Sequence, residues 1–219
     1  MKSESTGSVQ KLAKKPHLRV RAFRPEMVPH PWLKKQPRFG LPDGHLAIEI
    51  GCGTGLHSAE FARNHPDKTL IAIEQTAEKF RKFTQALQRD GAPENLYPIH
   101  GDAISWICHQ IPEDRISEYF LLYPNPWPKK RDLNQRWHAM PFMSYLLKTL
   151  QKGGRMILAT NESWYADEAR DYMVNYWGLS LDQALVLNEG SRGLTSPTLF
   201  EKKYLARGES CFHYEFRKL

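Results

Sequence analysis

Glu49-Ile50-Gly51-Cys52-Gly53-Thr54-Gly55 is the stretch that decides the fold of this chain. An apolar run over residues 46–50 leads into a loop with glycine at every second position, and a helical pattern follows. This succession of strand, glycine loop and helix lets a nucleotide-bearing ligand lie against bare backbone at a helix N-terminus. Glycine is needed because a side chain would block that approach and because the loop requires positive φ angles.

Two acidic residues beside the loop indicate which cofactor it holds. A dinucleotide fold usually has G-x-G-x-x-G, but here Gly55 comes one residue early and Glu49 precedes the loop. A second apolar run ends in Glu74, 23 residues after Gly51, where a ribose-binding acid is expected. S-adenosylmethionine has a sulfonium, an ammonium and a ribose diol but no phosphate, and these groups suit carboxylates. The spacing therefore favours S-adenosylmethionine, lying against Gly51, Gly53 and Gly55.

Strand-like runs alternate with helical patterns from residue 45 onward. The parallel strands are expected at 45–50, 69–74, 96–100, 119–123 and 155–159. The helices are expected at 55–64, 77–89, 138–150 and 163–176, before an antiparallel pair of strands at 181–187 and 211–216. This order predicts an α/β protein with the Rossmann-like, seven-stranded fold of class I S-adenosylmethionine-dependent methyltransferases.

A polar side chain stands where each of the five predicted parallel strands stops. These side chains are Glu49, Glu74, Asp102, Asn125 and Asn161. Ligands bind at the carboxyl ends of the strands in such sheets, so the five residues predict a site at that edge. Asp102 and Asn161 could instead cap the helices that follow them.

The positive charge of the chain is concentrated at its start, which predicts a basic, proline-rich arm at 1–44 ahead of a methyltransferase domain at 45–219. Residues 1–45 hold 10 Lys and Arg against 3 Asp and Glu, which equals the whole net charge of +7. We expect an irregular arm rather than a packed element. Its interleaved cations and aromatic rings favour RNA binding over a solvated tail that only aids solubility. They are Arg19, Arg21, Phe23, Arg24, Trp32, Lys34, Lys35 and Phe39.

Composition also excludes several classes of protein. The chain starts with polar residues, and no apolar run approaches the length needed to span a membrane. Cys52, Cys108 and Cys211 lack C-x-x-C spacing, and the nine histidines lack the spacing of metal ligands. We therefore expect a cytoplasmic protein with reduced thiols, no membrane association and no metal, and we leave open whether it is a monomer or a homodimer.

Three further motifs resemble those of one enzyme family. The segment Pro124-Asn125-Pro126-Trp127-Pro128-Lys129-Lys130-Arg131 resembles the P-D-P-W-x-K-x-R segment of the bacterial tRNA (guanine-N7)-methyltransferases. Ala159-Thr160-Asn161 resembles the A-T-D of that family, and Thr198-Leu199-Phe200-Glu201 resembles its T-x-F-E. The match covers residues 46–219 in order and spacing. Asn stands at 125 and 161 where the family has Asp, and the arm does not match.

The resemblance implies an enzyme that transfers a methyl group from S-adenosylmethionine to a guanosine in the variable loop of tRNA. It implies cofactor contacts from Glu49, Glu74, Asp102 and Asn125. It also implies substrate contacts from Lys129, Arg131, Asn161, Thr198, Phe200 and Glu201. Phosphate contacts would come from Lys129, Lys130, Arg131 and Arg136. Asn125 would position the base as the catalytic residue, and Glu201 or Asp102 would supply negative charge.

Two other functions stay open on the sequence. The order of Asn125, a proline and an aromatic residue is similar to the N-P-P-Y of amino-methyltransferases, which suggests an exocyclic amine or a small molecule as acceptor. A catalytically impaired homologue that only binds tRNA is the second, although the acids and the glycine loop favour an active enzyme.

Overall fold

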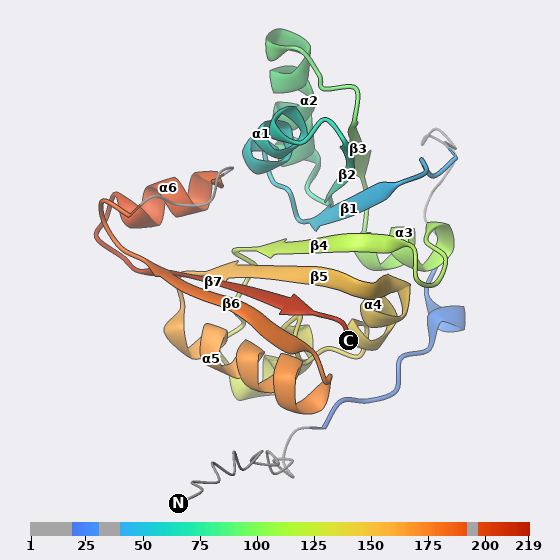
Figure 1. Ribbon diagram of the computed structural model, residues 1–219, viewed down its shortest axis with the longest axis vertical. Coiled ribbons are helices and arrows are strands. Elements are labelled where there is room, and N and C mark those ends of the chain that lie inside the picture. Colours follow the sequence, from blue (N-terminus) through green and yellow to red (C-terminus); the bar gives the residue numbers. More distant parts are fainter. Residues whose placement is uncertain (1–18, 31–39, 192–196) are drawn as a thin grey trace, which may run out of the picture.

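The computed structural model describes residues 19–30, 40–191 and 197–219, which build a seven-stranded sheet with helices on its two faces (Figure 1). The strands are β1 (His45–Ile50), β2 (Lys68–Glu74), β3 (Leu96–His100), β4 (Ile116–Leu122), β5 (Leu150–Thr160), β6 (Ser180–Leu187) and β7 (Cys211–Arg217). The α-helices are α1 (Leu56–Asn64), α2 (Ala77–Asp90), α3 (Ala103–Gln110), α4 (Met143–Thr149), α5 (Ser163–Asp171) and α6 (Leu199–Leu205). Short helical segments are η1 (Pro25–Met27), η3 (Lys130–Gln135) and the π-helical η4 (Tyr172–Tyr176).

The strands follow the order β3-β2-β1-β4-β5-β7-β6. The first five strands pair in parallel, whereas β7 lies antiparallel between β5 and β6. The chain order reverses between β1 and β4, which is the position where open parallel sheets bind ligands. This topology confirms the predicted Rossmann-like fold of class I methyltransferases.

Two apolar layers hold the helices on the sheet, because the central strands are buried on both faces. On one face, α1 and α2 pack Phe61 and Phe83 against β1, β2 and β4. On the other face, α3, α4 and α5 pack Ile107, Leu146 and Tyr165 against the same sheet. Every residue of β4 is buried, so this strand has no solvent-facing side that could have shown an alternating pattern.

Element boundaries differ from the prediction where proline or continuous burial hides the pattern. The helix expected at 138–150 is reduced to α4, because Pro141 has no N–H to donate within a helix. β5 starts at Leu150, earlier than predicted. Its first residues contact the C-terminal segment of the chain, since Gly153 N donates to Lys218 O at 2.8 Å. The helices α3 and α6 were not predicted. α3 is too apolar to show an amphipathic period, and α6 follows a loop rich in Gly, Ser and Thr.

Residues 19–30 include no buried residue and are irregular apart from η1, but they contact the helices α3 and α4. The Phe23 ring lies 5.3 Å from the Phe142 ring and 5.7 Å from the Tyr145 ring on α4. Ser105 Oγ donates to Pro29 O at 2.6 Å and so ties the arm to α3 as well.

Packing therefore removes Phe23 from the aromatic rings that were expected to face RNA. The three arginines around it are exposed, as expected for side chains that contact phosphates. They are Arg19, Arg21 and Arg24. The other cations and rings named for the arm lie outside the described residues. They are Trp32, Lys34, Lys35 and Phe39.

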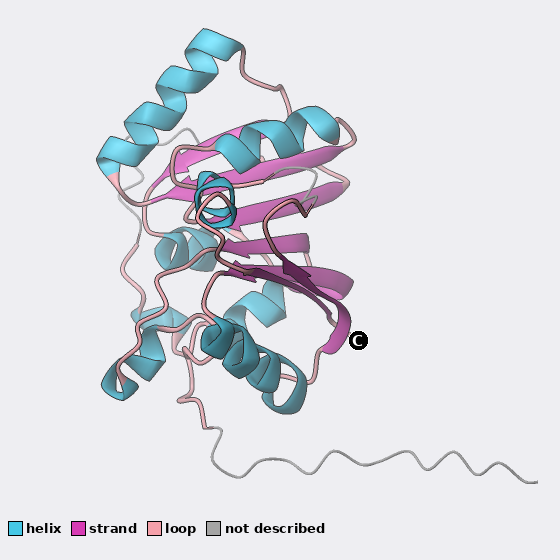
Figure 2. Cartoon of the chain, turned by 90° about the vertical axis from the view of Figure 1, so that its left-hand side faces the viewer, coloured by secondary structure: helices cyan, strands magenta, loops and turns pink. Residues whose placement is uncertain are grey.

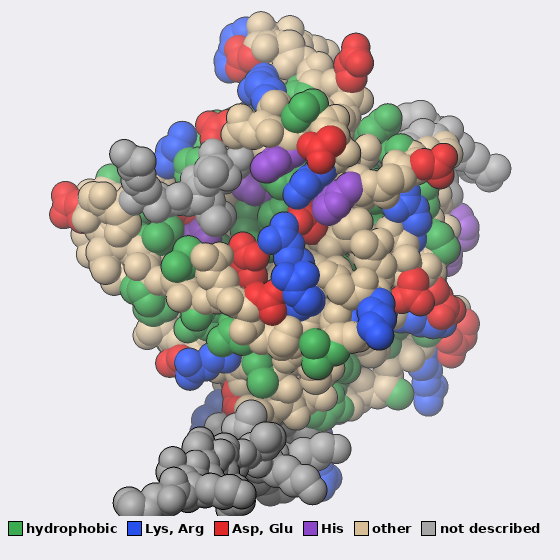
Figure 3. All heavy atoms as spheres, viewed as in Figure 1, with side chains coloured by type: hydrophobic (Ala, Val, Ile, Leu, Met, Phe, Trp, Pro, Cys, Tyr) green, Lys and Arg blue, Asp and Glu red, His purple; other side chains and the backbone are tan. Residues whose placement is uncertain are grey.

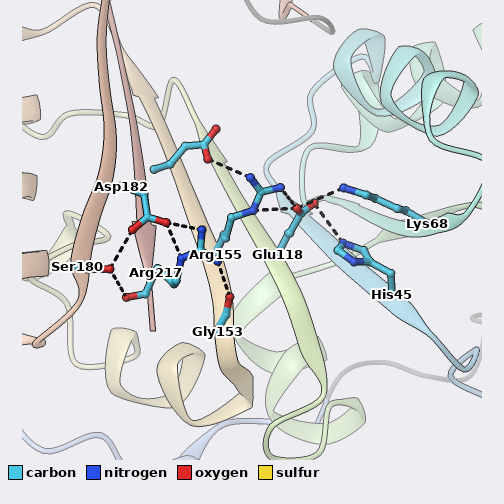
Figure 4. A network of polar contacts seen from close by, with 9 residues as sticks. His45, Lys68, Glu118, Gly153, Arg155, Ser180, Asp182 and Arg217 are labelled. Atoms are coloured by element: carbon cyan, nitrogen blue, oxygen red, sulfur yellow. Dashed lines mark hydrogen bonds and ion pairs between the residues drawn. The ribbon is translucent and has the colours of Figure 1, made fainter. Parts of the chain in front are cut away.

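A row of paired charges crosses the face of the sheet that carries α1 and α2. Figure 3 shows side chains of both signs gathered in a band across this side of the molecule. The buried Glu118 on β4 bonds to Arg155 and lies 3.4 Å from Lys68 Nζ and 3.3 Å from His45 Nε2 (Figure 4). Burial alone would raise the pKa of Glu118, but the bonds and charges of Arg155, Lys68 and His45 lower it. Arg155 also pairs with Glu215 at 3.1 Å, which extends the row to β7.

Candidate active site

A cavity of about 730 Å³ opens at the carboxyl ends of the parallel strands. It lies at the edge of the sheet that Figure 2 turns toward the viewer. The walls come from the glycine loop, the start of α2, the junctions after β3, β4 and β5, and α6. Of the predicted site residues, it brings together Gly51, Gly53, Glu74, Asp102, Asn125, Asn161 and Phe200.

The glycine loop presents bare backbone to this cavity. Gly51 and Gly53 have φ angles of 78° and 62°, and a Cβ added at either would meet nothing within 4 Å. Gly55 has a different role, because a Cβ there would lie 2.0 Å from the Phe83 ring. The first two glycines therefore leave room for a ligand, while Gly55 lets α1 and α2 approach each other.

Glu74 is fixed at the cavity wall by two backbone donors. Gly53 N donates to Glu74 Oε2 at 2.9 Å, and Thr76 N donates to Glu74 Oε1 at 2.6 Å. Each oxygen keeps a second lone pair that can accept a hydrogen bond from a hydroxyl group. The exposed Asp102 caps α3 through a bond from Ser105 N to its Oδ1 at 2.7 Å, and it also lines the cavity. Capping and ligand contact are thus compatible at this position.

Glu49 lies beneath the glycine loop, next to a second cavity of about 260 Å³. It is buried, and its Oε2 accepts hydrogen bonds from His57 Nδ1 at 2.9 Å and Ser58 Oγ at 2.5 Å. Both partners belong to α1, so Glu49 ties the end of β1 to the helix that follows the loop. The large cavity is bounded by Glu74 and Asp102 rather than by this carboxylate.

The surroundings of the glycine loop are electronegative. Burial raises the pKa of the Cys52 thiol well above its usual value, and the negative charges of Glu49 and Glu74 raise it further. The thiol stays protonated as a result. The same charges favour a cationic ligand over a phosphate at this loop.

Two residues of the loop after β4 have backbone conformations that side chains rarely adopt. Tyr123 and Trp127 have φ angles of 51° and 49°. A conformation of this kind costs about 1–3 kcal/mol per residue and persists only where surrounding contacts enforce it. Asn125 Oδ1 accepts a hydrogen bond from Trp127 N at 3.3 Å, which closes the turn between them.

Arg136 holds the later part of this loop. It donates from Nε to Trp127 O at 3.0 Å and from Nη2 to Pro128 O at 3.3 Å. Its Nη1 reaches both carboxylate oxygens of Glu168 on α5, at 2.8 and 2.6 Å. Arg136 is only 5% exposed, so the expectation that it contacts phosphates is wrong. Its guanidinium group is fully engaged inside the protein.

The other cations of this segment point outward. Lys129, Lys130 and Arg131 are exposed, as the predicted phosphate contacts require, and Arg131 lies 3.9 Å from Asp132. Asn161 lines the cavity, and its Nδ2 donates to Glu209 Oε2 at 3.0 Å.

The T-x-F-E segment divides between the cavity and the interior. Thr198 caps α6 by accepting from Glu201 N at 3.0 Å, and it lines the smaller cavity. The exposed Phe200 lines both cavities. Glu201 is 1% exposed and lies behind the wall, 2.8 Å from His213 Nε2 and 3.2 Å from Tyr123 Oη.

Several cavity residues carried no clear signal in the sequence. They are Gln75, Thr76, Lys79, Tyr123, Trp137, Glu162 and Tyr204. Tyr123 and Glu162 directly neighbour predicted strand ends and could have been found there. Trp137 and Tyr204 reach the cavity only through tertiary packing. Within the described ranges, no group of His, Cys, Asp and Glu could hold a metal ion, and no helix is both long and apolar enough to cross a membrane.

A family model described as "Putative methyltransferase" matches residues 43–214, which include the glycine loop and all three motifs. A protein named tRNA (guanine-N(7)-)-methyltransferase from Buchnera aphidicola subsp. Acyrthosiphon pisum is 31% identical over 78% of this chain and 72% of its own length. The chain belongs to the tRNA (guanine-N7)-methyltransferase family.

Other members of the family are longer. A relative of the same name from Thermotoga maritima is 29% identical over 80% of this chain but 54% of its own length. The chain spans between 48% and 65% of the length of this and four further curated relatives. The crystal structure of precorrin-6y C5,15-methyltransferase from Geobacter metallireducens GS-15 superposes with a TM-score of 0.56. At 13% identity, it covers 81% of this chain and 82% of that one, and it shows the shared fold.

We predict that His138 makes the protein less stable as the pH falls below 6.5. Burial lowers the pKa of His138 from its usual 6.5, although the hydrogen bond to Glu168 at 2.7 Å opposes this. Below pH 6.5 the unfolded chain therefore binds a proton that the folded chain resists. As the pH decreases, the free energy of unfolding should decrease by at most about 1.4 kcal/mol per pH unit for this one proton.

Urea denaturation of the wild type and of His138→Gln across this pH range measures the effect. The carboxylate of Glu168 titrates lower, because His138 and Arg136 outweigh its burial and lower its pKa below 4.5. The other histidines contribute equally to both proteins. Parallel pH profiles for the two proteins would contradict the prediction.

Proposed function

We propose that this protein transfers a methyl group from S-adenosylmethionine to N7 of a guanosine in the variable loop of tRNA. The observation that carries the proposal is the shared cavity, in which the glycine loop and its acids face the loop that holds Asn125 and Trp127. The names of the relatives support guanine N7 of tRNA as the target. A tRNA substrate would also place the protein in the cytoplasm.

The residues at the glycine loop fit S-adenosylmethionine. The bare backbone at Gly51 and Gly53 leaves space for it, and the fixed carboxylate of Glu74 suits a ribose diol. Asp102 would contact the cofactor, and the neighbouring carboxylates suit a sulfonium. When bound, S-adenosylmethionine supplies an electrophilic methyl group.

The chain needs no strong general base for this reaction. Guanine N7 has a free lone pair in the neutral base, so no proton leaves before attack. The protein must instead hold guanine N7 in line with the donated methyl group. Fixing two reactants in this orientation lowers the barrier to transfer. Asn125 would position the guanine, and its amide would stabilise the developing positive charge more weakly than a carboxylate.

The remaining negative charge would come from acids at the cavity wall. Asp102 and Glu162 line the cavity, whereas Glu201 lies behind Tyr123. Between the two acids named from the sequence, the position of Asp102 supports it as the source of this field. We propose for Glu201 a positioning role, because it holds Tyr123 and His213 at the end of β4 and on β7.

The tRNA would extend from the cavity over the exposed cations. Lys129, Lys130 and Arg131 are exposed in the segment that follows Trp127, which lines the cavity, and the arm at 1–44 would enlarge the footprint. Residues 19–30 of this arm contact α3 and α4. We propose that they bind the RNA from this position on the surface of the methyltransferase domain at 45–219.

The deciding experiment is methylation of unmodified tRNA with labelled S-adenosylmethionine, mapped by cleavage chemistry selective for 7-methylguanosine. We expect cleavage at one variable-loop guanosine. Label in an exocyclic amine or a small molecule would support the alternative acceptor suggested by Asn125 and Pro126. Binding of tRNA without transfer would indicate an impaired homologue and would overturn the proposed activity.

Asn125→Asp tests the role of the amide. A carboxylate next to the purine should stabilise the developing cation, so we expect kcat to rise about 10-fold, while Asn125→Ala should lower it. Single-turnover kinetics separates this effect from product release. The affinity for S-adenosylmethionine measured by calorimetry is the control. An unchanged rate in Asn125→Asp would contradict the role given to this residue.

The arginines of the arm can be tested by the salt dependence of tRNA binding. Replacing Arg19, Arg21 and Arg24 together by Gln should reduce the slope of log K against log salt by about 0.7–0.9 for each phosphate that the variant no longer neutralises. A matched control carries Gln at three cations that pair with neighbouring acids. These are Lys82, Arg89 and Lys148. Equal slopes for the two variants would show that the arm does not contact phosphates.

A further inference from the structure

Trp164 is a large aromatic side chain that the fold leaves 37% exposed in the first turn of α5. It follows Asn161 and Glu162, which both line the large cavity. No role in the proposed methyl transfer uses it. Its position at the rim therefore calls for a separate account.

The indole of Trp164 is held in one orientation although it is exposed. Its Nε1 donates to Glu162 Oε2 at 2.9 Å, so the polar edge of the ring is anchored toward the cavity wall. The Arg136 guanidinium lies over the ring, 4.9 Å from its centre. The Tyr165 ring meets it nearly at a right angle, at 5.7 Å. A ring fixed in this way loses little conformational entropy when a ligand stacks on it.

Arg136 also connects Trp164 to a second exposed indole. Trp127 is 38% exposed and lines the cavity, and its carbonyl oxygen accepts the bond from Arg136 Nε at 3.0 Å. The same buried guanidinium group thus sets the positions of two tryptophans from different segments. One belongs to the loop after β4 and the other to α5.

The charges around this pair suit a nucleic acid. Lys129, Lys130 and Arg131 are exposed just beyond Trp127 and Pro128, and Arg136 binds the carbonyl oxygen of Lys129. Exposed aromatic rings beside cations are the combination that binds unstacked nucleotides, because rings stack on bases while cations contact phosphates.

We infer that Trp164 is a stacking platform for the base of a nucleotide that flanks the methyl-accepting guanosine in the RNA. The inference rests on the proposed function, which places the acceptor guanosine in the cavity lined by Trp127. It adds a second nucleotide subsite outside that cavity. Stacking there would hold the RNA strand open beside its target base.

The test pairs protein variants with modified RNA. Wild type, Trp164→Ala and Trp164→Phe are compared on tRNA transcripts that carry an abasic site on the 5′ or the 3′ side of the acceptor guanosine. Affinity is measured by filter binding with S-adenosylhomocysteine present, and kcat/KM is measured in parallel. Loss of one stacked base should weaken wild-type binding about 10-fold on one of the two abasic transcripts.

Trp164→Ala should show the same loss on intact tRNA and no further loss on that abasic transcript, while Trp164→Phe retains most of the affinity. Leu185→Ala, which alters an exposed apolar residue on the edge strand β6, is the control and should bind as the wild type does. The inference would be overturned if Trp164→Ala lowered the affinity by the same factor on intact and abasic transcripts. It would also be overturned if Trp164→Ala lowered the affinity on none of them.

Separate measurements distinguish a structural role and a failure of the proposed function. A lower melting temperature or weaker cofactor binding in Trp164→Ala, without coupling to the abasic site, would assign the ring to packing on Arg136. Coupled binding without methyl transfer would support the platform and refute the chemistry. Wild-type protein that binds no tRNA would overturn both.

Discussion

Parallel pairing of β1 with both β2 and β4 is the constraint on which the site depends. It brings the carboxyl ends of successive strands to one edge, although those ends are separated by tens of residues in the chain. The reversal of strand order between β1 and β4 opens space there, because the connections leave the sheet on opposite faces. One side of this space carries backbone and carboxylates, and the other carries Asn125 and Trp127.

Arg136 gives the second side its shape. The positive φ angle of Trp127 needs a strong partner, and a buried guanidinium group bound to the carbonyl oxygen of Trp127 and to Glu168 supplies one. The arrangement is stable because charge and hydrogen bonds are satisfied together, since either ion buried alone would be costly. The loop is therefore anchored to α5, and Trp164 joins the same assembly through the face of its ring.

Burial separates the charged residues of this protein into different roles. Glu118 and Arg155 on the sheet, and Arg136 with Glu168 beside the cavity, are structural pairs. Lys129 and Arg131 lie only a few residues from Arg136 but remain exposed. The acids differ by position rather than by burial. The buried Glu74 lines the large cavity, whereas Glu49 and Glu201 are bound to residues of α1, of the loop after β4 and of β7. Residue type and spacing alone do not distinguish these cases.

The sequence by itself determined the fold and the position of the site. Buried parallel strands require continuous apolar runs, and the loops after them tolerate polar residues and glycine, so the strand ends from Glu49 to Asn161 were readable in order. The side of the cavity proposed for the cofactor was local in the same sense, since Gly51, Gly53 and Glu74 belong to consecutive strand ends. The boundaries of α4 and β5 were less accurate, because Pro141 and the continuous burial of neighbouring strands obscure the periodic pattern.

Only the tertiary structure decided which side chains face the cavity and which support it. Phe23 and Arg136 are of residue types common in RNA-binding surfaces, but each packs against residues distant in sequence. Trp164 gave no sequence signal, because its role depends on Glu162 beside it and on Arg136 from another segment. The physical reason is that exposure and hydrogen-bond partners are properties of the packed chain. A local pattern fixes where a residue lies along a strand or helix, but the contacts made across the fold determine what its side chain can bind.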